Sequence, residues 1–293
     1  MKKITVFLFV FSVILSAQVR VMETQVLDLG TNTILPVFSD DGKYLLFTST
    51  EGLKYYDLTK RTSSRIADMG YDYSMDNAGN IRFRVDSFDK GLRLNSVLLY
   101  DIKTKTTTKI LENKRLDVVP QITDHGVYYI ENETVKTNLS KSVSKSKPVV
   151  FSYNRSLLLY SNGATKILQP VGDEQFYIWP SVSPDNTQIC FVDKNDLYIT
   201  DLNGAIYTFV KEARAPKWSP DGKWITFMRD FDDGYHFTAS EIFVLRVADG
   251  MIFQLTDTAD RIEMSPSWSP DGTQIVCEDA ENDEFILFTL DLR

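Results

Sequence analysis

The sequence has 293 residues, of which 25% are charged, and a formal net charge of −8 at pH 7. A net negative charge argues against nucleic acid or an anionic membrane surface as the main partner. The length allows one domain of ordinary size and, once a leader is removed, leaves no room for a second.

The first residues are typical of a secretory signal peptide. Lys2 and Lys3 precede an apolar run over residues 4–15, and the small residues Ser16 and Ala17 follow. This run is too short to span a bilayer, which needs about 20 residues. We therefore expect residues 1–17 to be cleaved off. The mature domain, residues 18–293, should be periplasmic or secreted, without membrane insertion after signal cleavage.

A short phrase recurs along the rest of the chain. It consists of Pro, any residue, a large apolar residue, Ser, Pro or Asp, Asp and Gly, followed by strand-forming residues. Proline presets φ at the first turn position, Asp accepts hydrogen bonds from the following backbone, and Gly adopts a positive φ. Strand repeats spaced by roughly 35–60 residues are typical of a propeller. The six copies, some of them decayed, lie at residues 36–42, 73–79, 120–126, 180–186, 216–222 and 266–272.

Strand-like runs follow each phrase. Segments rich in β-branched and aromatic residues, such as 44–48 and 224–228, predict a second strand directly after the turn. Third runs are predicted at residues 53–58, 96–102, 156–160, 196–202, 241–247 and 284–290. Fourth runs are predicted at residues 63–67, 106–111, 164–168, 205–210 and 251–255.

The two ends of the chain predict how the ring closes. The sixth unit has no fourth run, whereas a strand-like run at residues 23–29 precedes the first phrase. Pairing this run with the last unit would cover two open strand edges. We therefore predict an all-β fold, a six-bladed β-propeller of four-stranded antiparallel blades, closed by an N-terminal strand that completes the last blade. A β-sandwich with ordinary Pro-Asp-Gly hairpins is the alternative.

The repeats also resemble a known family. Residues 219–227 and 269–277 carry the pattern Ser-Pro-Asp-Gly-(Lys/Thr)-x-Ile. This pattern is similar to the WD40-like Tol propeller repeat (PD40), found in TolB-type periplasmic proteins and in the propellers of prolyl oligopeptidase relatives. The resemblance implies a TolB-like six-bladed β-propeller that binds another protein of the cell envelope. The TolB N-terminal domain is lacking, because the chain has no room for it.

The usual parts of a catalytic or metal site are scarce. Only two histidines occur, His125 and His236, and neither has a partner at metal-ligand spacing. No Gly-x-Ser-x-Gly elbow is present. Cys190 and Cys277 are predicted in second strands of non-adjacent blades, where a disulfide would need Cα atoms within about 7 Å. We therefore expect free buried thiols, no enzymatic activity, no cofactor and no metal.

Two polar segments have alternative interpretations. Asp230–Gly234 is rich in carboxylates, as in a calcium loop, but its glycine stands one position too early for the EF-hand pattern. A solvated acidic hairpin loop is the simpler interpretation. Residues 136–147 carry four lysines among serines and are predicted as a polar loop within the third blade, with an electrostatic docking arm as the alternative.

The predicted topology separates two faces. All repeat turns lie on one face, and the longer, more varied connections lie on the other, which we call the loop face. Variable loops on a rigid scaffold are a common place for binding, and aromatic residues and Arg are enriched at interface hot spots. Packing between blades is the alternative for each aromatic residue. The candidate binding residues are Tyr71, Arg93, Phe176, Tyr177, Arg214, Phe231, Tyr235, His236 and Arg261.

These observations predict an exported, non-enzymatic binding or scaffold protein. It would present one propeller face to another cell-envelope protein or to a peptide. The alternatives are a carbohydrate- or peptide-binding accessory protein and an enzyme related to the propeller lyases. No oligomeric state is predicted.

Overall fold

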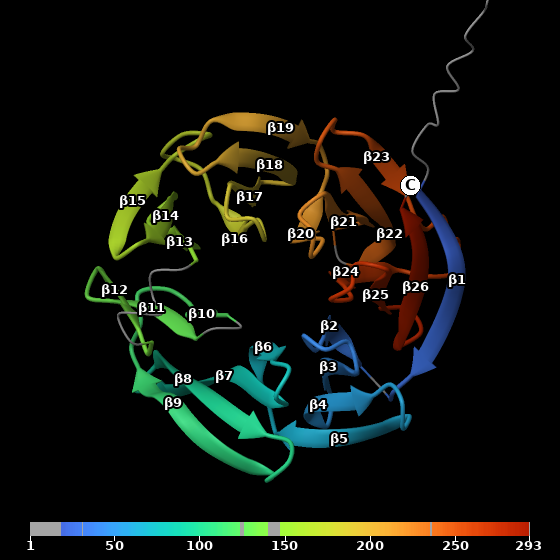
Figure 1. Cartoon of the computed structure of the whole chain (residues 1–293), viewed down its shortest axis with the longest axis horizontal. Coiled ribbons are helices and arrows are strands. Elements are labelled where there is room, and N and C mark those ends of the chain that lie inside the picture. The colour runs from blue at the N-terminus through green and yellow to red at the C-terminus, as the bar shows by residue number, and fades with distance from the viewer. Residues whose placement is uncertain (1–18, 31, 124–125, 140–146, 235, 293) are drawn as a thin grey trace, which may run out of the picture.

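The computed structural model describes residues 19–30, 32–123, 126–139, 147–234 and 236–292. These residues form seven antiparallel sheets, arranged as blades around a central axis (Figure 1). Five blades have four described strands and two have three. The all-β propeller is therefore confirmed, and the predicted six blades are corrected to seven.

The strands are named here from the axis outward. Blade 1 contains β2 (Ile34–Phe38), β3 (Tyr44–Ser49), β4 (Gly52–Asp57) and β5 (Thr62–Ala67), and blade 2 contains β6 (Tyr71–Met75), β7 (Asn80–Asp89), β8 (Leu92–Asp101) and β9 (Thr106–Lys114). Blade 3 contains β10 (Gln121–Ile122), β11 (Val127–Glu131) and β12 (Thr134–Thr137), and blade 4 contains β13 (Val149–Tyr153), β14 (Ser156–Ser161) and β15 (Ala164–Leu168). Blade 5 contains β16 (Ile178–Val182), β17 (Gln188–Asp193), β18 (Asp196–Asp201) and β19 (Ile206–Val210). Blade 6 contains β20 (Arg214–Trp218), β21 (Trp224–Asp232), β22 (Phe237–Arg246) and β23 (Ile252–Gln254). Blade 7 contains β24 (Glu263–Trp268), β25 (Gln274–Asp279), β26 (Glu284–Leu292) and β1 (Val19–Asp28).

The seventh blade arises where one long connection was predicted. Residues 131–155 contain the strands β12 and β13, so the single predicted blade at this point is two blades of three described strands each. Two tight hairpins make the difference. Asn132 and Glu133 join β11 to β12, and Asn154 and Arg155 join β13 to β14, all with φ between 48° and 60°. Two-residue turns with a positive φ at both positions usually have the sequence Asn-Gly. Here Glu or Arg replaces the glycine, so the sequence did not indicate these turns.

The repeat turn has the hydrogen bonds that its sequence predicts. In the copy at Ser219, the backbone N–H of Gly222 donates to the Ser219 carbonyl at 2.9 Å. The Ser219 hydroxyl donates to Asp221 at 2.7 Å and accepts from the Trp224 N–H at 2.9 Å. Gly222 has a φ of 70°. The same Ser–Asp hydrogen bond recurs at Ser39, Ser183 and Ser269.

The predicted closure of the ring is confirmed. Strand β1 pairs antiparallel with β26, from Val19 opposite Leu292 to Asp28 opposite Glu284. Leu27 is the one side chain of β1 that is fully buried, and it packs into a cluster shared by blades 7 and 1. Val19 of β1 is partly buried against another cluster. Closure therefore rests on the backbone ladder, on Leu27 as its most buried apolar side chain, and on Val19.

The hydrophobic core lies between neighbouring blades. One cluster, for example, joins Cys190 and Val192 of β17 to Ile225 and Phe227 of β21. Both cysteines are buried and free. Cys190 belongs to blade 5 and Cys277 to blade 7, so the prediction of unpaired thiols in non-adjacent blades is confirmed, with the blade numbers corrected.

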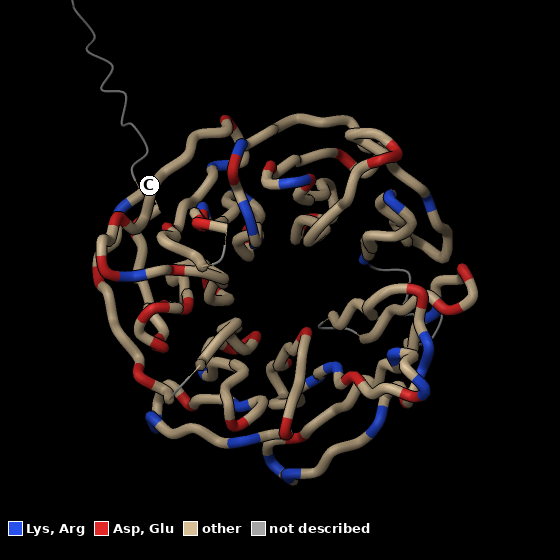
Figure 2. Tube along the Cα trace, turned by 180° about the vertical axis from the view of Figure 1, so that it is seen from behind, with Lys and Arg blue, Asp and Glu red and all other residues tan. Residues whose placement is uncertain are grey.

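Charged residues are distributed around the whole ring (Figure 2). The predicted loop at residues 136–147 begins inside β12, where Lys136 pairs with Glu131 at 2.5 Å. Lys141, Lys145, His125 and the predicted leader, residues 1–17, lie outside the described residues. Within the described ranges, no helix is long and apolar enough to cross a membrane.

Candidate functional site

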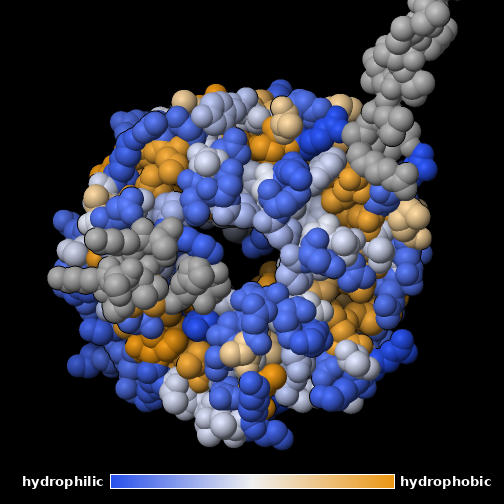
Figure 3. Space-filling model, viewed as in Figure 1, coloured by the Kyte–Doolittle hydropathy of each residue, from blue (hydrophilic) through white to orange (hydrophobic). Residues whose placement is uncertain are grey.

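The candidate site lies on the axis of the propeller. The space-filling view shows an opening at the centre of the disc (Figure 3). Behind it is a cavity of about 760 Å³, which we call the channel cavity. This volume is within the range of small-molecule sites. Its walls are the inner strands of several blades, including Asp72, Gln121, Ser152, residues 177–181, residues 216–218, Pro220, Ser267 and Trp268.

The inner strands share a backbone irregularity that shapes this wall. In five of them the register with the next strand shifts by a bulge near the start of the strand. One residue at each bulge has a positive φ although it is not glycine: Leu35, Asp72, Trp179, Ala215 and Ser265. Bulges re-aim side chains and are common near active sites. Four of these five residues precede a proline of the repeat phrase, a signal that could have located them.

Trp179 is the most unusual of these residues. Its φ is 49°, and its side chain is 45% exposed and lines the channel cavity. A positive φ at a bulky residue is a genuine outlier, and such a conformation costs about 1–3 kcal/mol. The strain places a large aromatic surface in the channel. Sequence analysis did not select Trp179.

Lys217 supplies an unpaired positive charge to the same cavity. It lies on β20 and lines the channel. Among the described residues, its ammonium group has neither an ion-pair nor a hydrogen-bond partner. Its side chain reaches the solvent of the channel but is enclosed by protein, and this desolvation lowers the pKa of Lys217. The negative charge of Asp72 opposes that change.

Asp72 does not cancel the charge of Lys217, because it already has a partner. The Asp72 carboxylate accepts from Nε of Arg84 at 2.6 Å. Arg84 is only 7% exposed, also pairs with Asp86, and lies 5.0 Å from the centre of the Tyr71 ring. The channel cavity therefore keeps a local positive charge beside exposed aromatic surface.

A smaller cavity of about 390 Å³ adjoins the channel on the loop face, and we call it the side chamber. It is lined by Arg93 and Asn95 of β8, by residues 116–119, and by Phe151 of β13. Val119, Gln121, Ser152 and Pro180 line both spaces, so the side chamber borders the channel cavity directly.

The structure brings only some of the predicted site residues to a cavity. Arg93 lines the side chamber and Tyr177 lines the channel cavity. Arg214 and Phe231 line a third, small pocket of about 80 Å³, where Arg214 pairs with Asp230. Arg93 belongs to blade 2, Tyr177 precedes the first strand of blade 5, and Arg214 and Phe231 belong to blade 6, so the four residues do not line one cavity.

Tyr177 differs most from its prediction. It was chosen as an exposed loop residue, but it is 1% exposed and packs against Phe191 with the ring centres 5.0 Å apart. Its hydroxyl donates to the carbonyl of Gly172 at 2.8 Å. Burial raises the pKa of Tyr177. Replacing it would open a hole in the core, so Tyr177→Ala should lower the stability of the fold.

The remaining predicted residues are dispersed. Tyr71 stacks with Arg84, and Phe176 is 63% exposed under the guanidinium of Arg155. His236 lies in an exposed loop, where its backbone N–H donates to the carboxylate of Asp233 at 2.8 Å. Tyr235 lies outside the described residues.

Arg261 is part of a buried acidic cluster between blades 6 and 7. It lies 3.6 Å from the Asp279 carboxylate, which is fully buried. Nearby, burial raises the pKa of Glu263 to about 7, opposed by a hydrogen bond from Thr258. The charges of Glu241 and Asp279 raise this pKa further.

The described residues show no grouping of three or more His, Cys, Asp or Glu that could hold a metal ion. In the acidic segment at residues 230–234, Asp230 pairs with Arg214. The carboxylate of Asp232 accepts from the N–H of Gly234 at 2.9 Å, as in a hairpin loop.

Comparisons with known proteins show the fold and bear on the function. No family profile matches the chain. A stretch of 111 residues is 28% identical to an uncharacterized peptidase, YuxL, of Bacillus subtilis (strain 168). The match covers 33% of this chain and 16% of that relative.

Two solved structures of oligogalacturonate lyases are similar to the chain. The one from Vibrio parahaemolyticus has 11% identity and a TM-score of 0.58, over 93% of this chain and 98% of that chain. The other, in complex with manganese, has 17% identity and a TM-score of 0.48, over 89% of this chain and 78% of that chain.

These likenesses support a propeller and do not show the predicted TolB-like family. The prediction that the chain is not an enzyme is contradicted, because the matching relative is named as a peptidase and the similar Vibrio structure as a lyase.

Proposed function

We propose that the protein binds an acidic oligosaccharide in its channel cavity and cleaves it. The observation that carries this proposal is the pairing of an unpartnered cation with exposed aromatic surface: Lys217 and Trp179 line the same cavity. The similarity in fold to a lyase that acts on oligogalacturonate supports the substrate class.

The wall of the channel suits a sugar ring. One face of a pyranose carries C–H groups and packs on aromatic rings, while its hydroxyls need a few placed polar groups. Trp179 offers an exposed ring, and Gln121, Ser152 and Ser181 add hydrogen-bonding groups. Trp218 and Trp268 add further aromatic surface on the inner wall.

The charge of the channel favours a sugar acid over a neutral sugar. The whole chain carries a net charge of −8, so a polyanion gains nothing from the average surface. Attraction must come from the channel itself, where Asp72 is neutralised by Arg84 and Lys217 is free. An ammonium in an enclosed site interacts more strongly with a carboxylate than it would in open water.

Cleavage of a uronic acid chain by elimination fits this arrangement. The proton on C5, the carbon beside the carboxyl group, passes to a water molecule, a C=C bond forms between C4 and C5, and the C4–O glycosidic bond breaks, its oxygen taking up a proton from water. Negative charge builds up on the carboxyl group during this step. Lys217 would stabilise that charge, which is the usual role of a preorganised cation in catalysis.

The test measures binding and product together. Tri-galacturonate would be titrated calorimetrically into wild type, Lys217→Gln and Trp179→Ala, and the unsaturated product followed by ultraviolet absorbance. Phe88→Ala is the matched control, because Phe88 is 72% exposed and lies away from the channel cavity. We expect Lys217→Gln to bind at least about tenfold more weakly, the loss associated with one charged contact. Trp179→Ala should also bind more weakly, because it removes the ring that packs on the sugar, and the control should bind as wild type.

Two results would contradict the proposal. One is equal affinity of wild type for tri-galacturonate and its carboxyl-reduced analogue. The other is binding of a peptide with no binding of either saccharide, which would favour the activity in the name of the Bacillus relative.

A further inference from the structure

The side chamber has its own positively charged group, Arg93, which the proposed function does not use. Arg93 lies on β8 and its side chain is 43% exposed. Its Nη2 forms an ion pair with a carboxylate oxygen of Asp86 at 2.9 Å. Within the described part of the chain this is its one ion pair, so most of the five donors of the guanidinium stay available.

Asp86 fixes the position of Arg93. Asp72, Arg84, Asp86 and Arg93 form a chain of two carboxylates and two guanidinium groups that is neutral overall, and the remaining N–H donors of Arg93 stay available. The Asp86 carboxylate is held from three sides, by Arg84, by Arg93, and by Nδ2 of Asn95 at 3.4 Å. Arg84 is buried and shared with Asp72 of the channel wall. One network thus connects the two cavities and orients Arg93 at the edge of the side chamber.

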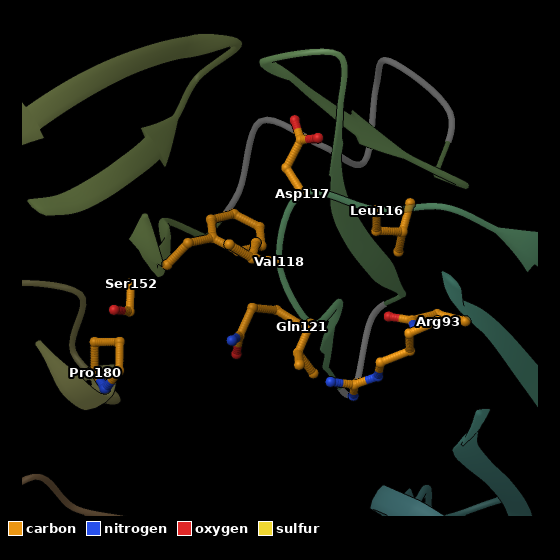
Figure 4. A pocket seen from close by; sticks show the side chains of 10 residues that line it. Arg93, Leu116, Asp117, Val118, Gln121, Ser152 and Pro180 are labelled. Carbon is orange, nitrogen blue, oxygen red and sulfur yellow. The ribbon is translucent and has the colours of Figure 1, made fainter. Parts of the chain in front are cut away.

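The other polar groups of the side chamber leave room for an anion. Figure 4 shows the guanidinium of Arg93 on one side of the chamber and the amide of Gln121 turned toward Ser152 and Pro180, while the carboxylate of Asp117 points away from both. Asp117 accepts there from the N–H of Glu133 at 2.8 Å. The Gln121 amide has no hydrogen-bond partner within the described ranges.

A ligand in the channel can extend into this chamber, because Gln121, Ser152 and Pro180 form part of both walls. We infer that the side chamber is a second subsite, in which Arg93 binds the carboxylate of a neighbouring sugar acid and Gln121 binds its hydroxyl groups. The inference rests on the proposed function. A planar guanidinium with several free donors matches a carboxylate better than a lysine ammonium does.

The experiment compares Arg93→Gln and Arg93→Lys with wild type, using tri-galacturonate and its carboxyl-reduced analogue in calorimetric titrations. We expect Arg93→Gln to weaken binding of the acidic trisaccharide about tenfold or more and to leave binding of the reduced analogue unchanged. The affinity of Arg93→Lys for the acidic trisaccharide should lie between those of wild type and Arg93→Gln, because lysine keeps the positive charge but lacks the paired N–H donors of the guanidinium. Arg65→Gln is the matched control, since Arg65 is a 53% exposed arginine paired with Asp68 on the outer strand β5.

The design separates this inference from the proposed function. If wild type binds the acidic trisaccharide and Arg93→Gln binds it equally well, the side chamber is not a subsite, and the channel proposal stands. If Arg93→Gln weakens the acidic and the reduced ligand alike, its effect is structural and the inference is wrong. In the Arg93 variants, the Asp86 carboxylate still has its ion pair with Arg84 and its hydrogen bond from Asn95. The melting temperatures of these variants should therefore stay close to that of wild type.

Discussion

Leu27 should control how firmly the ring is closed. It is 7% exposed and packs with Phe47 of blade 1 and Phe285 of blade 7. Truncating a buried leucine to alanine costs about 2–5 kcal/mol. Because Leu27 is close to fully buried, we expect Leu27→Ala to lower the free energy of unfolding by about 3 kcal/mol. At roughly 2–4 °C per kcal/mol, the melting temperature should fall by roughly 6–12 °C.

The neighbouring residue of the same strand provides the control. Val26 is 41% exposed and keeps the same backbone ladder, so Val26→Ala should cost less than about 1 kcal/mol. Both variants would be compared by urea unfolding, with hydrogen exchange of the β26 amides as a local measurement. Faster exchange of these amides is expected in Leu27→Ala. Equal stability of Leu27→Ala and wild type, or equal losses in the two variants, would refute the argument that Leu27 is the main apolar anchor of β1.

Other features of the structure predict measurable effects. Burial raises the pKa of Glu263 from 4.5 to about 7, so the native state keeps a proton that the unfolded chain loses, and stability should fall as pH rises between these values. In urea titrations, the free energy of unfolding of wild type should be lower at pH 8 than at pH 4.5, and Glu263→Gln should make this difference about 1–3 kcal/mol smaller. An equal difference in the variant and in wild type would contradict the prediction. Cys190 and Cys277 are buried and free, so a thiol reagent should find two thiols after denaturation and none before it; a linked peptide pair in mass spectrometry would overturn this. A Cβ at Gly52 would lie 2.2 Å from a backbone oxygen of β5, whereas one at Gly91 would meet no atom within 4 Å. Gly52→Ala should therefore destabilise by more than about 2 kcal/mol and Gly91→Ala by about 1, and equal thermal shifts would show that the backbone near Gly52 yields.

The architecture could be predicted where the repeat phrase keeps its turn chemistry. Around Ser219, the sequence alone predicts a turn whose Ser–Asp–Gly hydrogen bonds the structure then shows. The predicted number of blades was wrong because of the turns at Asn132 and Asn154. Each of these residues has a positive φ, and the next residue is Glu or Arg where such a turn usually has Gly. Propensity alone does not identify such turns, because tertiary packing of the flanking strands holds them.

The candidate site was harder to predict for a different reason. Tyr177 and Trp179 are two aromatic residues on the same inner strand segment, yet one is in the core and the other in the channel. The bulge at residues 178–181 breaks the regular alternation of side chains along the strand. A period-2 pattern would place both side chains on the same face, whereas Tyr177 is buried and Trp179 is exposed. Lys217 was not predicted as a site residue, because a lone lysine in a strand normally indicates a solvated surface.

The strand that closes the ring also determines when folding can finish. Asn32, just after β1, donates to Asp283, just before β26, and these two residues are 251 positions apart. Contacts of such long range form late, because the entropy of closing the loop must be lost before the ladder offsets it. Until then the outer edge of β26 has unpaired backbone groups, and the intermediate is prone to strand pairing with a second copy. Refolding yield should therefore fall with protein concentration, even though each of the other six blades forms from strands that are neighbours in the sequence.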